Sequence, residues 1–225
     1  MKLEYETLLN ELISLSNDEF KNFSKKIVNC SINVIGVKTP LIKELVKKYY
    51  ALSTDIDSIP YHKNFETDLF IGLYKMKSLK TNQEKYDFIY NFLLESDNWA
   101  IVDQISSAFK NKNETEVFNN ALRFLSSNGE YNRRFGYLHI LTNMSKQERA
   151  VDFMFEHIMH DTYYVMMSEA WLLSVLYIYF PKRIEELLFS TNTPKFIVNK
   201  SISKICDSRR VDENYKKSLK VHRIK

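Results

Sequence analysis

Apolar residues recur at steps of three and four along most of the 225-residue chain. In residues 88–93, 101–109 and 117–125, each apolar position lies about one helical turn from the next, with polar residues between them. This periodicity predicts amphipathic α-helices rather than strands, in which apolar and polar residues would alternate. The chain has room for about a dozen such helices joined by loops of a few residues, so the sequence predicts an all-α fold.

Polar residues mark where several of these helices begin. Thr81–Glu84 and Ser145–Glu148 fit the capping box, in which a hydroxyl and a carboxylate satisfy free amide groups at the first turn. Asp97, Asp161 and Asp212 are expected to cap three further helices. Thr39-Pro40 places a capping residue before a proline, which fits the first helical position because it has no N–H to satisfy.

Alternate predicted helices begin at nearly constant intervals. Their expected starts are Asn64, Asp97, Glu130, Asp161 and Pro194. The intervals are 33, 33, 31 and 33 residues, which is typical of a right-handed solenoid of antiparallel helix pairs that bury their apolar faces against one another. We expect a single domain over residues 1–225 with a concave basic groove, although ordinary spacing in a helical bundle is an alternative.

Composition agrees with this fold class and also indicates where in the cell the protein is expected. The chain has four glycines and four prolines, too few for the turns of a sandwich, barrel or doubly wound sheet. The longest apolar run, residues 170–180, is far shorter than the roughly 20 residues that span a bilayer. The first residues are charged and lack the apolar core of a signal peptide. We therefore expect a cytoplasmic protein without a membrane partner.

The formal net charge of +4 is unevenly distributed. Residues 195–225 contain ten Lys and Arg against three Asp and Glu, so this segment carries +7 and the remaining residues carry −3. A basic end on a nearly neutral body indicates contact with a polyanion, and nucleic acid is the first candidate. The alternative is a solvated last helix that only aids solubility.

Several familiar kinds of site are absent from the sequence. No glycine-rich loop precedes a predicted helix, which argues against a nucleotide-phosphate site. His157 and His160 lie three residues apart without a cysteine or paired carboxylate nearby, so we interpret them as surface histidines. Cys30 and Cys206 are too few for a disulfide scaffold and are expected to be buried, inert thiols. We expect neither a metal nor a cofactor.

Residues that could take part in catalysis or binding fall on alternate predicted helices. Trp99 and Asp103 lie four residues apart, so they share one helix face about one turn from each other. The next alternate helix carries Arg133 and Arg134 among apolar residues, and the one after that carries Trp171. A buried aspartate needs a partner or a wet cleft. These residues could line a shared functional groove, or they could belong to an ordinary core.

The chain resembles the alkylpurine DNA glycosylases of the AlkD type, which are built from HEAT-like helical repeats. The resemblance extends from about residue 20 to residue 220 and includes residues 199–211, similar to the closing helix of many relatives. Each motif is weak alone, whereas their order and spacing together are fairly specific. Four stretches carry most of it: residues 36–40, 96–103, 131–134 and 164–171.

The resemblance implies a monomeric, cofactor-free DNA N-glycosylase acting on duplex DNA. Trp99 and Asp103 match the pair that faces the sugar of the modified nucleotide, and Trp171 matches the second tryptophan of the groove. Arg134 matches the arginine that holds a backbone phosphate, with Arg133 as its adjacent alternative. Further DNA contacts are expected from the basic end, at Lys200, Lys204, Arg209 and Arg210.

The chain also departs from the family pattern. Ser174 stands where an arginine is expected three residues after the second tryptophan, and Met166 and Met167 stand where a basic residue is usual. Tyr131 replaces a more common tryptophan. Three hypotheses follow: an N-glycosylase that releases cationic N3- or N7-alkylpurines, a DNA-binding module that recognises damaged or branched DNA without chemistry, and a protein–protein scaffold.

Overall fold

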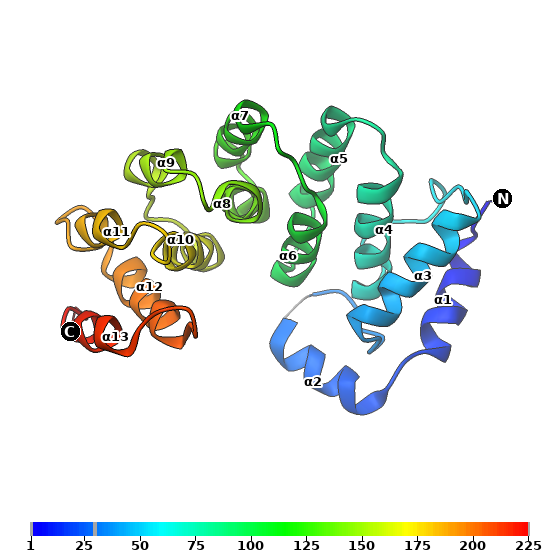
Figure 1. Ribbon diagram of the computed structural model, residues 1–225. Helices are drawn as coiled ribbons and strands as arrows, with labels where there is room; N and C mark the ends of the chain where they lie inside the picture. The colour runs from blue at the N-terminus through cyan, green and yellow to red at the C-terminus, as the bar shows by residue number, and fades with distance from the viewer. Residues whose placement is uncertain (1, 29–30, 225) are drawn as a thin grey trace. The chain divides into compact units, whose positions relative to one another are not determined.

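The computed structural model describes residues 2–28 and 31–224 of the chain. Over these residues it contains thirteen α-helices and no named β-strand, which confirms the predicted all-α fold. The chain divides into two compact units, Met1–Phe109 and Lys110–Lys225, which are described separately below (Figure 1). Cys30, expected from the sequence to be a buried thiol, lies outside the described residues.

The first unit is organised around one central helix, α4. Eleven of the fourteen α4 residues are buried, because this segment (FETDLFIGLY) is apolar on most of its circumference. It packs against α3 and α6, with further contacts to α1 and α5 (Figure 1). The helices of this unit are α1 (Tyr5–Ser14), α2 (Asp18–Val28), α3 (Thr39–Ala51), α4 (Phe65–Ser78), α5 (Asn82–Leu94) and α6 (Trp99–Ala108).

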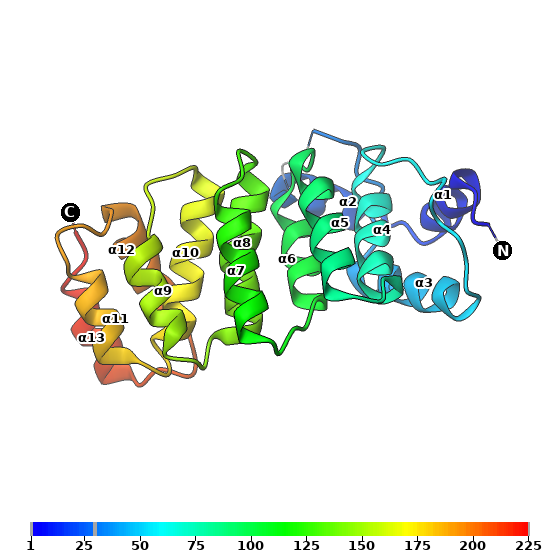
Figure 2. The same ribbon diagram turned by 90° about the horizontal axis from the view of Figure 1, so that it is seen from above.

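The second unit repeats a pair of helices three times and ends in a short helix. The alternate helices α8, α10 and α12 pack in sequence on one another, and α7 packs on α8 (Figure 2). In Figure 1, α7, α9 and α11 form one layer of this unit and α8, α10 and α12 form the other. The helices are α7 (Glu114–Leu125), α8 (Glu130–Met144), α9 (Arg149–His157), α10 (Tyr163–Leu176), α11 (Pro181–Leu188), α12 (Lys195–Asp207) and α13 (Glu213–Lys220).

The predicted repeat of helix pairs is confirmed within the units. The five alternate helices begin within two residues of their expected starts, as the bounds of α4, α6, α8, α10 and α12 show. Each pair buries its apolar stripe against the next, as helical-repeat proteins do. The hand of the solenoid, its concave groove and its unity as one domain stay predictions.

The expected helix caps are only partly right. The capping box of Thr81 and Glu84 is present in both directions. Ser145 instead ends α8, and α9 begins four residues later without a side-chain cap, so the second predicted box is wrong. Asp161 does not cap α10, because its carboxylate is bound by Arg133 as described below.

The loop that leads into α3 encloses a buried carboxylate. Glu66, in the first turn of α4, is fully buried, and its two oxygens accept hydrogen bonds from the amides of Ile35 (2.8 Å), Gly36 (2.7 Å) and Val37 (3.1 Å). Gly36 adopts φ of +100°, and a Cβ there would lie 2.5 Å from the Cβ of Lys21. Glycine is therefore required where the loop turns around the carboxylate.

Candidate functional site

Trp99 and Asp103 lie on the first turns of α6, as the sequence predicts. Asn98 caps this helix, because its Oδ1 accepts a hydrogen bond from the amide of Ala100 at 2.8 Å. Both Trp99 and Asp103 are half-buried, while Ile101 and Val102 between them point into the core of the first unit. The helix thus uses one face for packing and leaves an indole and a carboxylate, one turn apart, partly accessible.

The residues that precede Asp103 are anchored to the end of α2. The indole Nε1 of Trp99 donates to the carbonyl of Ile27 at 3.3 Å, and Nδ2 of Asn98 donates to the carbonyl of Val28 at 3.1 Å. The carboxylate of Asp97 accepts hydrogen bonds from the amide and the hydroxyl of Ser31. The last two carbonyls of α2 thereby accept hydrogen bonds, and the direction of the indole is set by α2.

This anchoring corrects one prediction and adds one residue. Asp97 was expected to cap α6, but Asn98 caps it and Asp97 binds Ser31 instead. Asn98 is fully buried and uses its side chain on both sides, toward α2 and toward α6. Asparagine before a helix is a common cap, so this signal was present in the sequence, whereas its link to α2 depends on tertiary structure.

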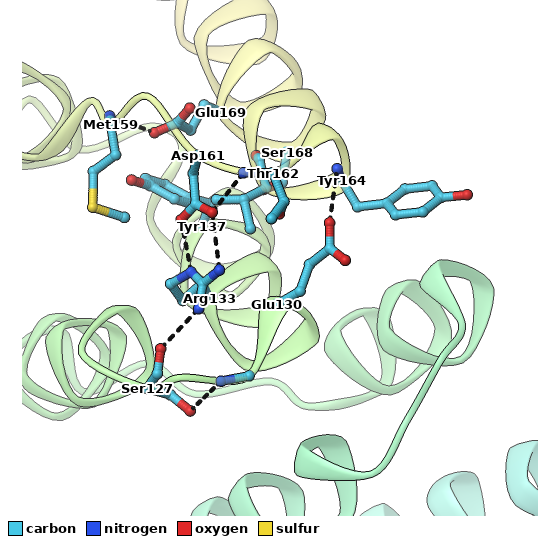
Figure 3. A network of polar contacts seen from close by, with 12 residues as sticks. Ser127, Glu130, Arg133, Tyr137, Met159, Asp161, Thr162, Tyr164, Ser168 and Glu169 are labelled. Carbon is cyan, nitrogen blue, oxygen red and sulfur yellow. Dashed lines mark hydrogen bonds and ion pairs between the residues drawn. The ribbon is translucent and has the colours of Figure 1, made fainter.

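The guanidinium of Arg133 is paired with groups of the protein itself, Asp161 and Ser127. Its guanidinium forms a bidentate ion pair with Asp161, through Nε at 2.6 Å and Nη2 at 2.9 Å, and Nη1 donates to the carbonyl of Ser127 at 3.0 Å (Figure 3). Burial opposes the charge of Asp161, but the hydrogen bonds from Arg133 and the amide of Thr162 outweigh it and lower the pKa of Asp161. The pair ties the start of α8 to the loop before α10.

Arg134 also makes a structural contact. Only 5% of this residue is exposed, and its Nη1 donates to the carbonyl of Tyr164 at 2.8 Å. The amide of Tyr164 in turn donates to Oε1 of Glu130 at 3.2 Å (Figure 3), and the rings of Tyr131 and Tyr164 lie 5.8 Å apart. The two arginines and their neighbours therefore fasten the first turn of α8 to the first turn of α10.

Trp171 lies on α10 beside the basic helix α12. It is half-buried, and the ammonium of Lys204 lies 5.5 Å from the centroid of its ring. Ser174, one turn further along α10, is buried and donates its hydroxyl to the carbonyl of Trp171 at 2.7 Å. Met166 and Met167 are half-buried. The structure thus brings Trp171 and Lys204, both predicted site residues, into direct contact.

The other predicted cations of the basic end differ in their surroundings. The ammonium of Lys200 lies 5.7 Å from the centroid of the Phe196 ring. Arg210 is exposed, lies over the ring of Tyr179 at 5.2 Å and donates to its hydroxyl at 2.6 Å. Arg209 is exposed. These side chains are available to a ligand on the surface of the second unit.

The predicted site residues therefore form two groups. Trp99 and Asp103 lie together in the first unit, and Trp171 and Lys204 lie together in the second. A single groove shared by both groups stays a prediction. Sequence reasoning missed Asp161 as the partner of Arg133, because an aspartate before a helix resembles a cap and an ion pair across 28 residues leaves no local signal.

A buried glutamate lies behind the arginine contacts of the second unit. Glu169 of α10 is fully buried, and its Oε1 accepts a hydrogen bond from the amide of Met159 at 2.8 Å (Figure 3). Burial raises the pKa of Glu169 to about 8, although the hydrogen bond from Met159 opposes that shift. At neutral pH this carboxyl group is therefore mostly protonated in the folded protein and ionised in the unfolded chain.

Glu169→Gln is expected to flatten the dependence of stability on pH. The raised folded-state pKa means that folding takes up a proton between about pH 4.5 and pH 8, so the contribution of Glu169 to wild-type stability is greatest below this window and falls as pH rises through it. Glutamine removes the ionisation, and the variant gains on the wild type by up to about 1.4 kcal/mol per pH unit. Urea unfolding between pH 5 and pH 8 measures this difference.

The control for this comparison is Glu156→Gln. The Glu156 side chain on α9 is 72% exposed, so its replacement removes one carboxylate from the surface of the same unit. A stability difference between Glu169→Gln and the wild type that stays constant with pH would contradict the assignment.

The described residues contain no cluster of metal-ligating side chains, that is, no group of three or more His, Cys, Asp and Glu that could hold a metal ion. His157 packs against the ring of Phe153, His160 is exposed, and Cys206 is a half-buried free thiol. Among the described helices, none combines the length and apolar character needed to cross a bilayer.

Comparison with known proteins tests the resemblance. A sequence-family model described as DNA alkylation repair enzyme matches residues 8–192, which is well over half of the chain. This range includes α6, α8 and α10 with Trp99, Asp103, Arg134 and Trp171, and it ends just before α12. Comparison with curated proteins gives no match. The match confirms the family resemblance drawn from the sequence motifs.

Proposed function

The chain belongs to the family of DNA alkylation repair enzymes, and from this premise we propose that it is a monofunctional DNA N-glycosylase. Its substrates are purines that carry a positive charge after alkylation at N3 or N7, within duplex DNA. It hydrolyses the N-glycosidic bond, and it acts as a monomer without a metal or cofactor. The partial exposure of Trp99 and Asp103 on one face of α6, together with Trp171 and the basic residues of α12, supports this proposal.

The reaction starts from a leaving group that is already activated. A cationic alkylpurine departs with the electron pair of the bond to C1′ and becomes neutral, and the sugar becomes an oxocarbenium-like cation. Water then adds to C1′ and gives up a proton. The Asp103 carboxylate stabilises the developing positive charge electrostatically and accepts the proton of the attacking water, which then passes to solvent.

Indole rings attract positive charge. An aromatic face near a cation contributes about 0.5–2 kcal/mol, depending on how dry the contact is. Trp99 is half-buried and held by its hydrogen bond to Ile27, so its ring does not have to be ordered when substrate arrives. Trp171 has a ring that already attracts the Lys204 ammonium. Both properties support a role in binding a cationic nucleotide.

The phosphate backbone is held by the basic end of the chain in this proposal. Lys200, Lys204, Arg209 and Arg210 lie on α12 or directly after it and are exposed or half-exposed. Arg133 and Arg134 already have protein partners, so their main contribution is to hold α8 against α10. A phosphate contact of Arg134 requires its guanidinium to donate outward as well as to Tyr164.

The observation that carries the proposal is the Trp99–Asp103 pair on one accessible face of α6, in a chain of this family. Incubation of the wild type with duplex DNA methylated at N7 of guanine and N3 of adenine tests it. We expect free 7-methylguanine and 3-methyladenine by chromatography, with strand breaks appearing only after alkali treatment. Unchanged amounts of both bases in the DNA would contradict the proposal.

A second candidate is binding without chemistry. It is favoured by Ser174, whose buried hydroxyl turns back to the carbonyl of Trp171 and offers a phosphate no cation. A binding module of this kind holds alkylated or branched duplexes in a salt-sensitive way without releasing a base. Duplex binding by the wild type with no base release selects it over the glycosylase, and no duplex binding at physiological salt leaves the protein–protein scaffold.

A further inference from the structure

Three loops of the second unit meet at one tyrosine. Lys146 lies two residues after the end of α8, Tyr179 three residues after α10, and Arg210 three residues after α12. The ammonium of Lys146 lies 5.9 Å from the centroid of the Tyr179 ring, and the guanidinium carbon of Arg210 lies 5.2 Å from it. Because α8, α10 and α12 pack in sequence on one another, the loops at their carboxyl ends form one edge of the unit.

The contacts at this edge leave both cations accessible. Nη2 of Arg210 donates a hydrogen bond to the Tyr179 hydroxyl at 2.6 Å, and the amide of Arg210 donates to the hydroxyl of Ser208 at 3.2 Å. Tyr179 is half-buried, whereas Lys146 and Arg210 are exposed. An ammonium has three N–H donors and a guanidinium has five, so both groups can bind a further acceptor while they contact the phenol.

Neither positive charge is neutralised by a carboxylate of the described residues. The acidic residues that follow the two cations in their loops bind elsewhere: Arg183 pairs with Glu148 at 3.1 Å, and Asp212 caps α13 by accepting the amide of Asn214 at 2.8 Å. Two cations at one ring without a neighbouring carboxylate create a local positive potential, which attracts an anion.

We infer that Lys146, Tyr179 and Arg210 form a binding site for backbone phosphate of duplex DNA, at the edge where α8, α10 and α12 end. This inference rests on the proposed function, because it takes duplex DNA as the ligand. The guanidinium binds phosphate oxygens through its planar fork of donors, and the ammonium binds them as a point charge. Lys146 lies outside the basic end of residues 195–225, so the charge distribution along the chain does not reveal this contact.

The edge lies close enough to Trp171 for one duplex to contact both. Tyr179 follows Trp171 by eight residues, which corresponds to about 12 Å along the axis of α10. This distance is shorter than the diameter of a DNA duplex. Contacts of this kind fix the position of DNA on the protein without reading its sequence.

Loss of either charge should weaken duplex binding in a salt-dependent way. Lys146→Met and Arg210→Met remove one charge each and keep the apolar part of the side chain or most of it. Each variant should bind the duplex about three- to ten-fold more weakly at 0.1 M salt, with a salt slope smaller by about one, and the double variant should lose about two. Fluorescence anisotropy of a labelled, unmodified duplex measures both quantities.

The matched control is Arg183→Met. The guanidinium of Arg183 also lies over an aromatic ring, that of Phe155 at 5.4 Å, so the variant loses the same charge and a similar ring contact. Arg183 belongs to α11, in the layer of α7, α9 and α11, and it pairs with Glu148 and Asp152 (Figure 1). Its salt slope should equal that of the wild type.

Lysine reactivity tests the contact in the unaltered protein. Reductive methylation of the wild type, followed by mass spectrometry, compares Lys146 with Lys182, which is also exposed and lies on α11. Duplex DNA should slow methylation of Lys146 and leave Lys182 unchanged. Inorganic phosphate at the same ionic strength should protect neither residue, because the expected ligand is the DNA backbone and not a free anion.

Four results would overturn the inference. They are wild-type protein that does not bind the duplex, wild-type salt slopes in Lys146→Met and Arg210→Met, an equal loss of slope in Arg183→Met, and protection of Lys146 by inorganic phosphate as strong as that by DNA. The duplex carries no lesion, so failure of the proposed function is recognised separately. Duplex binding with the expected slopes but no release of alkylpurines contradicts the glycosylase alone, and base release with unchanged slopes contradicts this inference alone.

Discussion

Asp103→Asn is expected to lower the rate of base release from methylated duplex DNA by about 10²–10³-fold, the usual cost of removing one electrostatic stabiliser from a transition state. Asparagine has nearly the same shape, so α6 and the Trp99 contact with Ile27 are retained. It has no negative charge to offer a cationic sugar, and it is a poor acceptor for the proton of water. Single-turnover chromatography of the released base measures the rate.

Binding distinguishes this effect from a general loss of structure. Removal of a carboxylate from a DNA-binding surface reduces repulsion, so duplex affinity should stay the same or increase in Asp103→Asn. Asp87→Asn is the control, because it removes the same charge from the neighbouring helix α5, where Asp87 accepts a hydrogen bond from Gln83 at 2.9 Å. Equal base release by the wild type and Asp103→Asn would contradict the assigned role of the carboxylate.

The fold was predictable because its signals are local. The apolar periodicity of a helix and the residues that mark its start lie within one or two turns of each other. These signals placed the starts of α4, α6, α8, α10 and α12 within two residues of those observed. The same reasoning placed Trp99 and Asp103 on one face of α6. A same-face pair on one helix needs no knowledge of tertiary packing, since helical geometry alone determines it.

The polar contacts around the site were not predictable in this way. Asp161 was read as a cap but pairs with Arg133, and Arg134 donates to the Tyr164 carbonyl thirty residues away. Nothing in the sequence around Glu66 distinguishes it from any other acidic residue in a first helical turn. Each partner is chosen by which groups become buried together when helices pack, and no spacing rule encodes that. The Glu66 carboxylate explains why the motif of residues 36–40 begins with glycine, because the amide of Gly36 donates to it.

The buried carboxylate of Glu66 links the loop before α3 to the central helix α4. Three consecutive amides, from Ile35 to Val37, donate to its two oxygens at 2.7–3.1 Å. The loop turns around the carboxylate at Gly36, where the positive φ and the close approach of Lys21 leave no room for a side chain. Removal of the carboxylate leaves three buried N–H groups without acceptors, and each such group costs about 1–3 kcal/mol.

Glu66→Ala is therefore expected to destabilise the protein by about 3–5 kcal/mol, since partial hydration of the opened loop recovers some of the loss. Thermal unfolding followed by circular dichroism should show a Tm lower by about 6–20 °C. Glu66→Gln, which keeps one acceptor oxygen, should fall between this variant and the wild type. Glu44→Ala is the control, because that exposed carboxylate pairs with Lys47 at the surface of α3 and its loss should cost about 0.5 kcal/mol or less. Equal Tm values for Glu66→Ala and Glu44→Ala would show that the amides of the loop find other acceptors.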